Sequence, residues 1–390
     1  MPEQLTTRLF SIAPAALEGR RDVTVIDLRA PGEFDLDHVS GAHSVPLFDD
    51  DERALVGTLY RQRGQSEAFD AGLEITHRKI ADLVARIASI AGRAHDPLED
   101  LRAKVTELTV GGIHALETRL GPEARATLPS GALVLCCWRG GLRSQSVAAL
   151  LQSLGHADAH FVEGGYKAWR AHVRAAIDTW QAPPSFTLRG LTGVGKTLVL
   201  RALEELRPGW TLDLEGLAGH RSSILGMVGL EPVNQKIFDR RLFERLRSGF
   251  PGPCVVEGES RKVGDIVLPK SVWTAVDDGV PIELVASVPR RVEVLIEDYL
   301  ATGDARAELA RQLPYIEARL GSRKYAGVLT GLLAEGADAE LVELLLERYY
   351  DPLYRHSESG HDYQVSIDTT DPRATAEAIV AWIEARGFEA

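Results

Sequence analysis

The strongest constraint on the fold is a glycine-rich stretch of eight residues near the middle of the chain, GLTGVGKT at residues 190–197. An apolar run precedes it at residues 186–188, and a helical pattern follows at residues 198–206. Glycines let backbone N–H groups approach phosphate oxygens, a lysine neutralises charge, and a threonine hydroxyl can reach Mg²⁺. The stretch therefore predicts a phosphate-binding loop, although it leaves the bound molecule open. The binding positions are Gly190, Gly193, Val194, Gly195, Lys196 and Thr197.

Other polar residues are candidates for the same site. Glu257 and Glu259 follow an apolar run at residues 254–256, and alternate residues of an extended strand lie on one side. Either carboxylate could approach Mg²⁺ held by Thr197, but solvated acids at a strand end would have the same pattern. Arg221 lies in a predicted loop rich in glycine and carboxylates, and we predict that it contacts a bound anion.

A second candidate site surrounds two adjacent cysteines in the stretch CCWRGGLRS at residues 136–144. This stretch joins a predicted strand to a predicted helix, so loop N–H groups and the helix N-terminus can converge on one anion. We predict that Cys137 is a nucleophile with a lowered pKa, and that Arg139 and Arg143 add positive charge. Cys136 is predicted to be a buried apolar residue of the strand.

Composition limits the remaining functions. The 390 residues suffice for two or three domains with their own cores. A net charge of −12 excludes a uniformly basic surface but allows a local basic groove. Three cysteines cannot form a disulfide framework, residues 1–5 lack the basic start of a secretory signal, and no apolar stretch approaches the length of a membrane span. We therefore expect reduced thiols, a cytoplasmic location and no membrane partner.

The alternation of apolar runs and helical patterns predicts an α/β chain of two domains with largely parallel sheets. Residues 1–180 form the first domain, with a helical insertion at about 47–108 that contains no catalytic motif. Residues 181–185, QAPPS, are a helix-breaking linker, and residues 186–390 form a parallel-sheet domain with a mainly helical C-terminal region. Predicted strands lie at residues 23–27, 132–136, 161–162, 186–188, 254–256 and 282–286.

Motifs on both sides of the cysteine loop resemble a rhodanese domain over about residues 1–178. They are DLR at 27–29, EF at 33–34, His38, GA at 41–42, VP at 45–46 and EGGYKAW at 163–169. A cysteine, five residues and an arginine also occur in phosphotyrosine phosphatases, so the loop alone leaves phosphate hydrolysis and chalcogen transfer open. The resemblance implies that Cys137 carries sulfur or selenium as a persulfide or perselenide. From the residues alone, Asp27 and Arg29 form a structural ion pair, and Gly164-Gly165 form a turn before a helix.

Over nearly its whole length the chain resembles bacterial tRNA 2-selenouridine synthases. The resemblance rests on the cysteine loop, the helical insertion, the phosphate loop, and the segments DLEGLAGHR at 213–221, EGESR at 257–261, RLGSRKY at 319–325 and YYDPLY at 349–354. It implies a rhodanese-like domain followed by a P-loop NTPase-like domain. It also implies that wobble 2-thiouridine of tRNA is S-geranylated from geranyl diphosphate, and that selenium from selenophosphate then replaces the geranylthio group. Mg²⁺ would be the cofactor, and Lys196 would neutralise the departing diphosphate.

Two other functions stay open at this point. One is an ATP- or GTP-dependent kinase or transferase with an appended sulfur carrier, which predicts nucleotide turnover. The other is a tRNA-binding or regulatory module without activity, against which two complete motifs argue. Binding of tRNA by an acidic protein requires clustered basic residues, each of which could instead be an ordinary exposed helix charge or part of an ion pair. The candidates are Arg240, Arg241, Arg245, Arg247, Arg290, Arg291, Arg319, Arg323 and Lys324.

Overall fold

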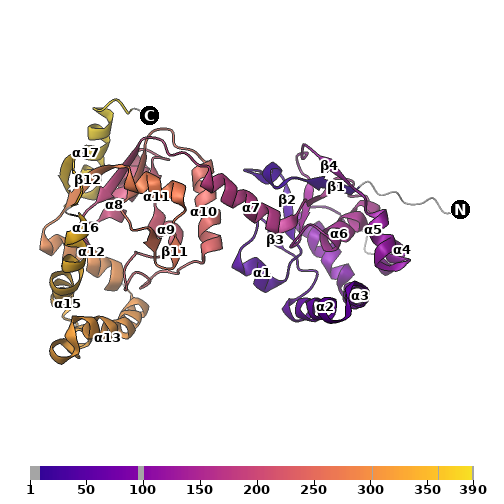
Figure 1. Cartoon of the computed structure of the whole chain (residues 1–390), viewed down its shortest axis with the longest axis horizontal. Coiled ribbons are helices and arrows are strands. Elements are labelled where there is room, and N and C mark those ends of the chain that lie inside the picture. The colour runs from indigo at the N-terminus through magenta and orange to yellow at the C-terminus, as the bar shows by residue number, and fades with distance from the viewer. Residues whose placement is uncertain (1–8, 95–100, 301, 359, 389–390) are drawn as a thin grey trace. The chain divides into compact units, whose positions relative to one another are not determined.

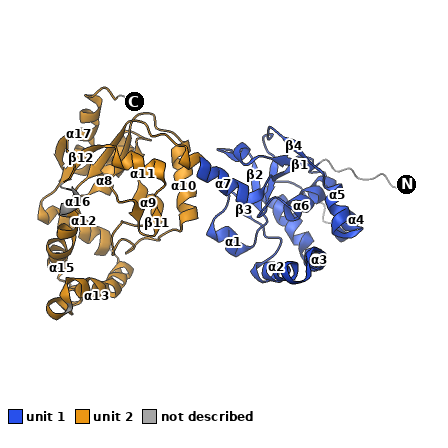
Figure 2. Ribbon diagram, viewed as in Figure 1, with its two compact units in different colours: residues 1–175 blue, residues 176–390 orange. Residues whose placement is uncertain are grey.

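The computed structural model describes residues 9–94, 101–300, 302–358 and 360–388, so residues 1–5 lie outside it. The chain divides into two compact units, residues 1–175 and 176–390 (Figure 2). Each unit has a parallel sheet with helices around it, and the second unit carries further helices in its C-terminal part (Figure 1). The predicted fold class is therefore confirmed. Within the described residues, every helix is too short or too polar to span a membrane.

Unit 1 is built on a six-stranded parallel sheet in the order β3-β2-β5-β6-β1-β4. Strands β2, β5 and β6 correspond to predicted apolar runs, and β5 and β6 are buried along their whole length. Strand β4 was not predicted, because its four residues are all exposed at the edge of the sheet. The bounds are β1 Leu9–Ile12, β2 Thr24–Asp27, β3 His43–Ser44, β4 Pro122–Arg125, β5 Leu133–Cys136 and β6 Ala159–Val162.

The helical insertion of unit 1 comprises α2 to α5. Helix α3 buries Ile80, Leu83, Val84 and Ile87 at helical spacing, and they join strand residues in one core. The insertion extends to Arg119, beyond the predicted end at about residue 108, because α5 follows α4. The bounds are η1 Pro14–Leu17, α1 Pro31–Leu36, α2 Asp50–Arg63, α3 Gln65–Ile90, α4 Leu101–Thr109, α5 Gly112–Arg119, α6 Leu142–Ser153 and α7 Gly165–Asp178.

Unit 2 contains a five-stranded parallel sheet in the order β13-β12-β7-β9-β8, with β7 at its centre. Phe186 and Leu188 of β7 join a core with α8 and α17. The intervening Thr187 faces the other side and donates a hydrogen bond to the Val276 carbonyl at 2.9 Å. The bounds are β7 Ser185–Arg189, β8 Thr211–Leu212, β9 Cys254–Glu257, β12 Val280–Val285 and β13 Val365–Asp368, with a separate antiparallel pair β10 Lys262–Val263 and β11 Ile266–Val267.

The helices of unit 2 cover this sheet and form a C-terminal bundle with its own apolar core. The C-terminal region is mainly helical, as predicted, although β13 interrupts it. The bounds are α8 Lys196–Leu206, α9 Leu214–Ala218, α10 Gln235–Arg247, α11 Lys270–Asp277, α12 Val288–Leu300, α13 Gly303–Tyr325, α14 Val328–Glu335, α15 Asp338–Leu345, the π-helical turn η2 Leu346–Tyr350, α16 Asp351–Glu358 and α17 Pro372–Glu384.

Candidate functional site

The cysteine loop lies between the carboxyl end of β5 and the start of α6. Cys137 directly follows β5, and only 2% of it is exposed. Its Sγ lies 3.2 Å from the Oγ of Ser144 in the first turn of α6, and that hydroxyl donates a hydrogen bond to the Gly141 carbonyl. The first N–H groups of a helix have no intrahelical partner, so the sulfur lies beside the positive end of α6.

The predicted turn at Gly164-Gly165 is confirmed, and its backbone packs directly against the cysteine loop. Gly165 begins α7 with a φ of 61°. A Cβ on it would lie 2.3 Å from the carbonyl oxygen of Cys137 and 2.4 Å from the amide nitrogen of Gly140. Glycine permits both this backbone conformation and this approach. The Tyr166 N–H donates to the Cys137 carbonyl at 2.8 Å and fastens the loop to α7.

The neighbouring Cys136 is completely buried, as predicted. Burial, and next the charge of Asp27, raise the pKa of its thiol well above the ordinary value. Asp27 and Arg29 form the predicted ion pair at 2.6 Å, and both side chains are buried. Cys136 is therefore a protonated structural thiol beside a structural ion pair.

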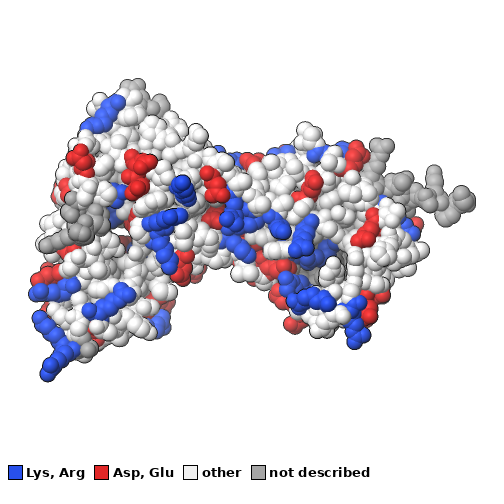
Figure 3. Space-filling model, viewed as in Figure 1, with Lys and Arg blue, Asp and Glu red and all other residues white. Residues whose placement is uncertain are grey.

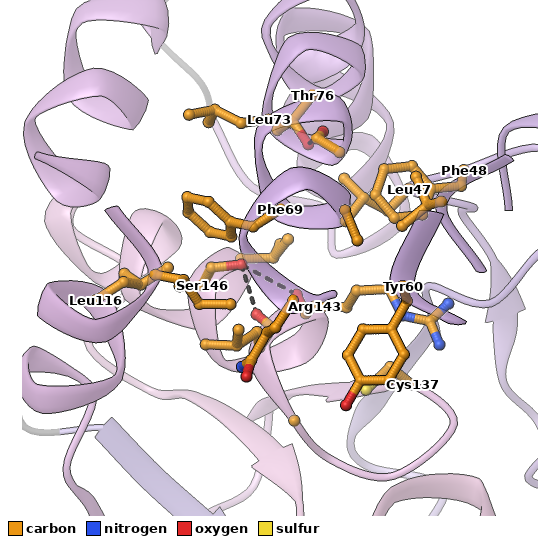
Figure 4. Close-up of a pocket in the computed structure, with 18 of the residues that line it drawn as sticks. Leu47, Phe48, Tyr60, Phe69, Leu73, Thr76, Leu116, Cys137, Arg143 and Ser146 are labelled. Carbon is orange, nitrogen blue, oxygen red and sulfur yellow. Dashed lines mark hydrogen bonds between the residues drawn. The ribbon is translucent and has the colours of Figure 1, made fainter. Parts of the chain in front are cut away.

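A cavity of about 840 Å³ in unit 1 includes Cys137, Arg139 and Arg143 in its wall. Most of the wall is apolar and comes from the helical insertion and α6. Figure 4 shows Phe69 and Leu73 of α3 among the residues that line it. The structure thus brings the three predicted residues of the cysteine loop to the edge of a large apolar space.

The phosphate loop connects β7 to α8 in unit 2. Gly190, Gly193 and Gly195 have φ values of 143°, 82° and 86°, which favour glycine. The Lys196 Nζ donates to the Gly190 carbonyl across the loop at 3.0 Å. These residues and Thr197 line a second cavity of about 360 Å³, so the structure brings the predicted phosphate-binding residues together.

Two buried contacts hold the phosphate loop in place. Arg291 is 3% exposed, donates from Nε to the Thr192 carbonyl at 2.8 Å, and pairs with both carboxylate oxygens of Asp351. The Thr369 hydroxyl donates to the Val194 carbonyl at 2.6 Å. The Val194 side chain is buried in the core, so only its backbone can meet a phosphate. Arg291 is therefore excluded from the candidates for tRNA contact, because its side chain is buried and forms an ion pair.

Three glutamates lie near Thr197 at different depths. The Thr197 hydroxyl donates to Glu215 Oε2 at 3.4 Å, and the Glu215 N–H donates to Glu257 Oε1 at 2.7 Å. The expectation that Glu257 and Glu259 share one side of a strand is wrong, because β9 ends at Glu257. Glu259 and Glu215 line the cavity, whereas Glu257 is 2% exposed and does not. Glu215 was not among the predicted site residues, although it lies in the same segment as Arg221.

The electrostatics of these acids favour a cation. Burial, and next the Glu259 carboxylate, raise the pKa of Glu215, while burial and next Asp213 raise the pKa of Glu257. Among the described residues, no group of three or more His, Cys, Asp or Glu could hold a metal ion by itself. A Mg²⁺ ion that also binds phosphate oxygens needs few protein ligands. The oxygen donors of Thr197, Glu215 and Glu259 fit that requirement.

Arg221 lines the phosphate-loop cavity, as predicted from its segment, but local contacts also fix it. Its guanidinium donates to the Asp298 carbonyl at 3.2 Å and lies 4.7 Å from the ring centroid of Tyr299. Arg201 lines the same cavity and was missed. Its spacing of four residues from Thr197 on α8 is the signal that could have identified it.

The predicted tRNA-contact residues fall into exposed and structural groups. Arg245 is half-buried and donates to the Gly209 and Thr211 carbonyls at 2.7 and 2.8 Å, which makes it a structural residue. Arg240 and Arg290 are half-buried and pair with glutamates on their own helices. Figure 3 shows Lys and Arg side chains, with Asp and Glu among them, on the visible surface of each unit. The exposed candidates in unit 2 are Arg241, Arg247, Arg319, Arg323 and Lys324.

Comparisons with known proteins follow the same division into two units. The family described as tRNA 2-selenouridine synthase AAA domain matches residues 183–387, and the rhodanese-like domain family matches residues 112–172. A curated tRNA 2-selenouridine synthase of Cupriavidus pinatubonensis is 31% identical over 93% of this chain and 94% of its own. The chain belongs to the tRNA 2-selenouridine synthase family. Family members of Bordetella petrii (33% identical, 86% of this chain and 87% of theirs) and Chromohalobacter salexigens (31%, 87% and 89%) are also similar over most of both lengths.

Proposed function

We propose that this chain is a transferase that converts wobble 2-thiouridine of tRNA into 2-selenouridine by way of an S-geranylated intermediate. One observation carries the proposal: in a chain of this family, a phosphate loop lies in one unit, and a cysteine beside a large apolar cavity lies in the other. These two sites suit the two reactions. Geranyl diphosphate and selenophosphate are the proposed co-substrates.

In the first reaction the sulfur of 2-thiouridine bonds to C1 of the geranyl group, and the bond from C1 to the diphosphate oxygen breaks. Negative charge builds on the leaving diphosphate, so Lys196 and the loop N–H groups would stabilise the transition state. Mg²⁺, when bound at Thr197, Glu215 and Glu259, supplies further neutralisation. Arg221 and the loop amides would bind and orient the diphosphate. Hydrolysis of a nucleotide is not required.

In the second reaction selenium takes the place of the geranylthio group, which leaves as geranylthiol. Water accepts the phosphoryl group of selenophosphate, so phosphate is the other product. Selenium stays at the selenide level throughout, so no perselenide is required. The Cys137 thiolate would bond to C2 of the base and expel geranylthiol, and selenide released from selenophosphate would then displace Cys137. Arg139 and Arg143 would hold anionic selenophosphate at the loop. Burial raises the pKa of the neighbouring Cys136 and keeps it a protonated thiol, so we assign Cys136 no role in this transfer.

The test is mass spectrometry of 2-thiouridine tRNA incubated with the protein, Mg²⁺, geranyl diphosphate and selenophosphate, with each component omitted in turn. Geranyl diphosphate and Mg²⁺ alone should give the geranylated nucleoside, and selenophosphate should convert it to 2-selenouridine. Consumption of ATP or GTP with no change in the tRNA mass would refute the proposal and favour a kinase.

A pair of single-atom changes separates the two reactions. Cys137→Ser should abolish selenium transfer and leave geranylation intact, because a serine hydroxyl is not ionised at neutral pH. The matched control Cys136→Ser should retain both reactions. The measurement is the ratio of 2-geranylthiouridine to 2-selenouridine in the treated tRNA. Unimpaired selenouridine formation by Cys137→Ser would exclude Cys137 as the nucleophile of the second reaction.

A further inference from the structure

The cavity beside Cys137 is larger and more apolar than transfer of a single atom requires. Its volume of about 840 Å³ lies within the usual range of small-molecule pockets, about 300 to 1,000 Å³. Ligand pockets are lined mainly by apolar side chains with a few polar groups, and this cavity has such a lining. Its size and lining therefore suit a ligand with an apolar part. Its wall includes Phe48, Val56, Phe69, Leu73, Ile113 and Leu116.

The wall of this cavity contains charged side chains as well as apolar ones. The cysteine loop contributes Cys137, Arg139 and Arg143, and α2 contributes the exposed Arg53 and Arg61. In Figure 4, Cys137 and Arg143 lie on one side of Phe69 and Leu73 lies on the other. Figure 3 shows basic side chains around a hollow over α2. The cavity thus joins a nucleophile and anion-binding side chains to an apolar interior.

We propose that this cavity binds the geranyl chain of S-geranyl-2-thiouridine during selenium transfer. The ten-carbon chain would occupy the apolar interior, the modified base would lie at Cys137, and Arg53 and Arg61 would contact the tRNA phosphates beside it. This inference rests on the proposed function, because it takes the geranylated nucleotide as the substrate of the second reaction. It assigns the helical insertion the role of recognising the leaving group.

The first test varies the length of the chain. Short RNAs carry S-methyl, S-dimethylallyl or S-geranyl 2-thiouridine, and their dissociation constants for the full-length protein are measured by fluorescence anisotropy. Each buried methylene is expected to tighten binding by up to about fourfold. Affinity should therefore rise from methyl to dimethylallyl to geranyl. Equal affinity for all three RNAs would overturn the proposal.

The second test fills the cavity. Ala68 is buried on α3 in the cavity wall, whereas Ala81 is exposed on the same helix outside it. Ala68→Phe should remove the dependence of affinity on chain length and should slow selenium transfer to presynthesised S-geranyl RNA at least tenfold. Ala81→Phe should behave like the unchanged protein. Leu73→Trp is the second filling variant. Circular dichroism verifies that each variant is folded, and geranylation verifies that the first reaction is unchanged.

Failure of this inference can be distinguished from failure of the proposed function. Selenium transfer to S-geranyl RNA that is the same in Ala68→Phe, Leu73→Trp and the unchanged protein would refute the cavity assignment and leave the two reactions standing. Calorimetric titration with geraniol tests the cavity without any reaction. Binding by the unchanged protein and its loss in the filling variants would support the cavity assignment, even if no RNA were modified.

Discussion

Replacement of Arg291 by glutamine is expected to destabilise unit 2 and weaken its phosphate loop. The side chains of Arg291 and Asp351 are 4% and 11% exposed, and two hydrogen bonds of 2.5 and 3.1 Å join them. Removal of one partner leaves a buried charge without compensation, which costs about 3 to 5 kcal/mol. The bond from Arg291 to the Thr192 carbonyl is lost as well. The free energy of unfolding of unit 2 should therefore fall by about 3 to 5 kcal/mol.

The assay is hydrogen exchange of the full-length chain in increasing denaturant, read on peptides from β7 and α12, because these report on unit 2 separately. The control is Arg290→Gln, since the Glu293 partner of Arg290 is 62% exposed and the change should cost no more than about 0.5 kcal/mol. The double variant Arg291→Gln/Asp351→Asn should lose much less free energy of unfolding than the two single variants lose in sum, because neither change then leaves an unpaired charge. Diphosphate affinity should fall with Arg291→Gln. Unfolding within about 0.5 kcal/mol of the unchanged protein would refute the structural role.

Three further outcomes are expected. Lys196→Ala should slow geranylation about 30- to 1,000-fold, equivalent to about 2 to 4 kcal/mol of lost charge stabilisation, without loss of tRNA affinity; normal product formation would contradict this. Charge reversal of the exposed Arg241 and Arg247 should flatten the salt dependence of tRNA binding by about 0.7 to 0.9 per lost phosphate contact, whereas Arg245→Gln should lower stability instead. Because the folded pKa of Glu257 is raised, the folded state binds more protons, and the free energy of unfolding should decline as the pH rises from about 4.5 through the folded pKa. Glu257→Gln should remove part of this decline in denaturant titrations, and an unchanged decline would show that Glu257 does not cause it.

The sequence allowed prediction of those parts of the fold that contiguous residues determine. The run from β7 through the phosphate loop to α8 contains its own strand, glycines and helix signal. The same holds for β5, the cysteine loop and α6. Strand β13 at Val365–Asp368 could not be found this way, because none of its residues is fully buried and it lies at the sheet edge, where it pairs with β12 from a distant part of the chain. Its location depends on that pairing.

The roles of the basic residues were predicted less well, since residue type does not determine burial. Arg291 and Asp351 are 60 positions apart, and no local pattern marks them as a pair. Arg245 lies in an arginine-rich helix that resembles a nucleic-acid contact, yet it binds backbone carbonyls of its own unit. Its neighbours Arg241 and Arg247 are exposed. A high density of charge along a sequence therefore identifies a candidate helix, but only the structure shows which of its residues are free to make contacts.

The pocket formed by the helical insertion could not be recognised from the sequence either. Its sequence contains no catalytic motif, and its apolar residues have the spacing of an ordinary core face. A side chain that lines an apolar pocket and one that fills a core obey the same pattern, because both face away from water. They differ only in whether neighbouring helices close the remaining space. Here they leave about 840 Å³ open beside Cys137, so a substrate with a long apolar chain can be recognised by residues that individually have no chemical signature.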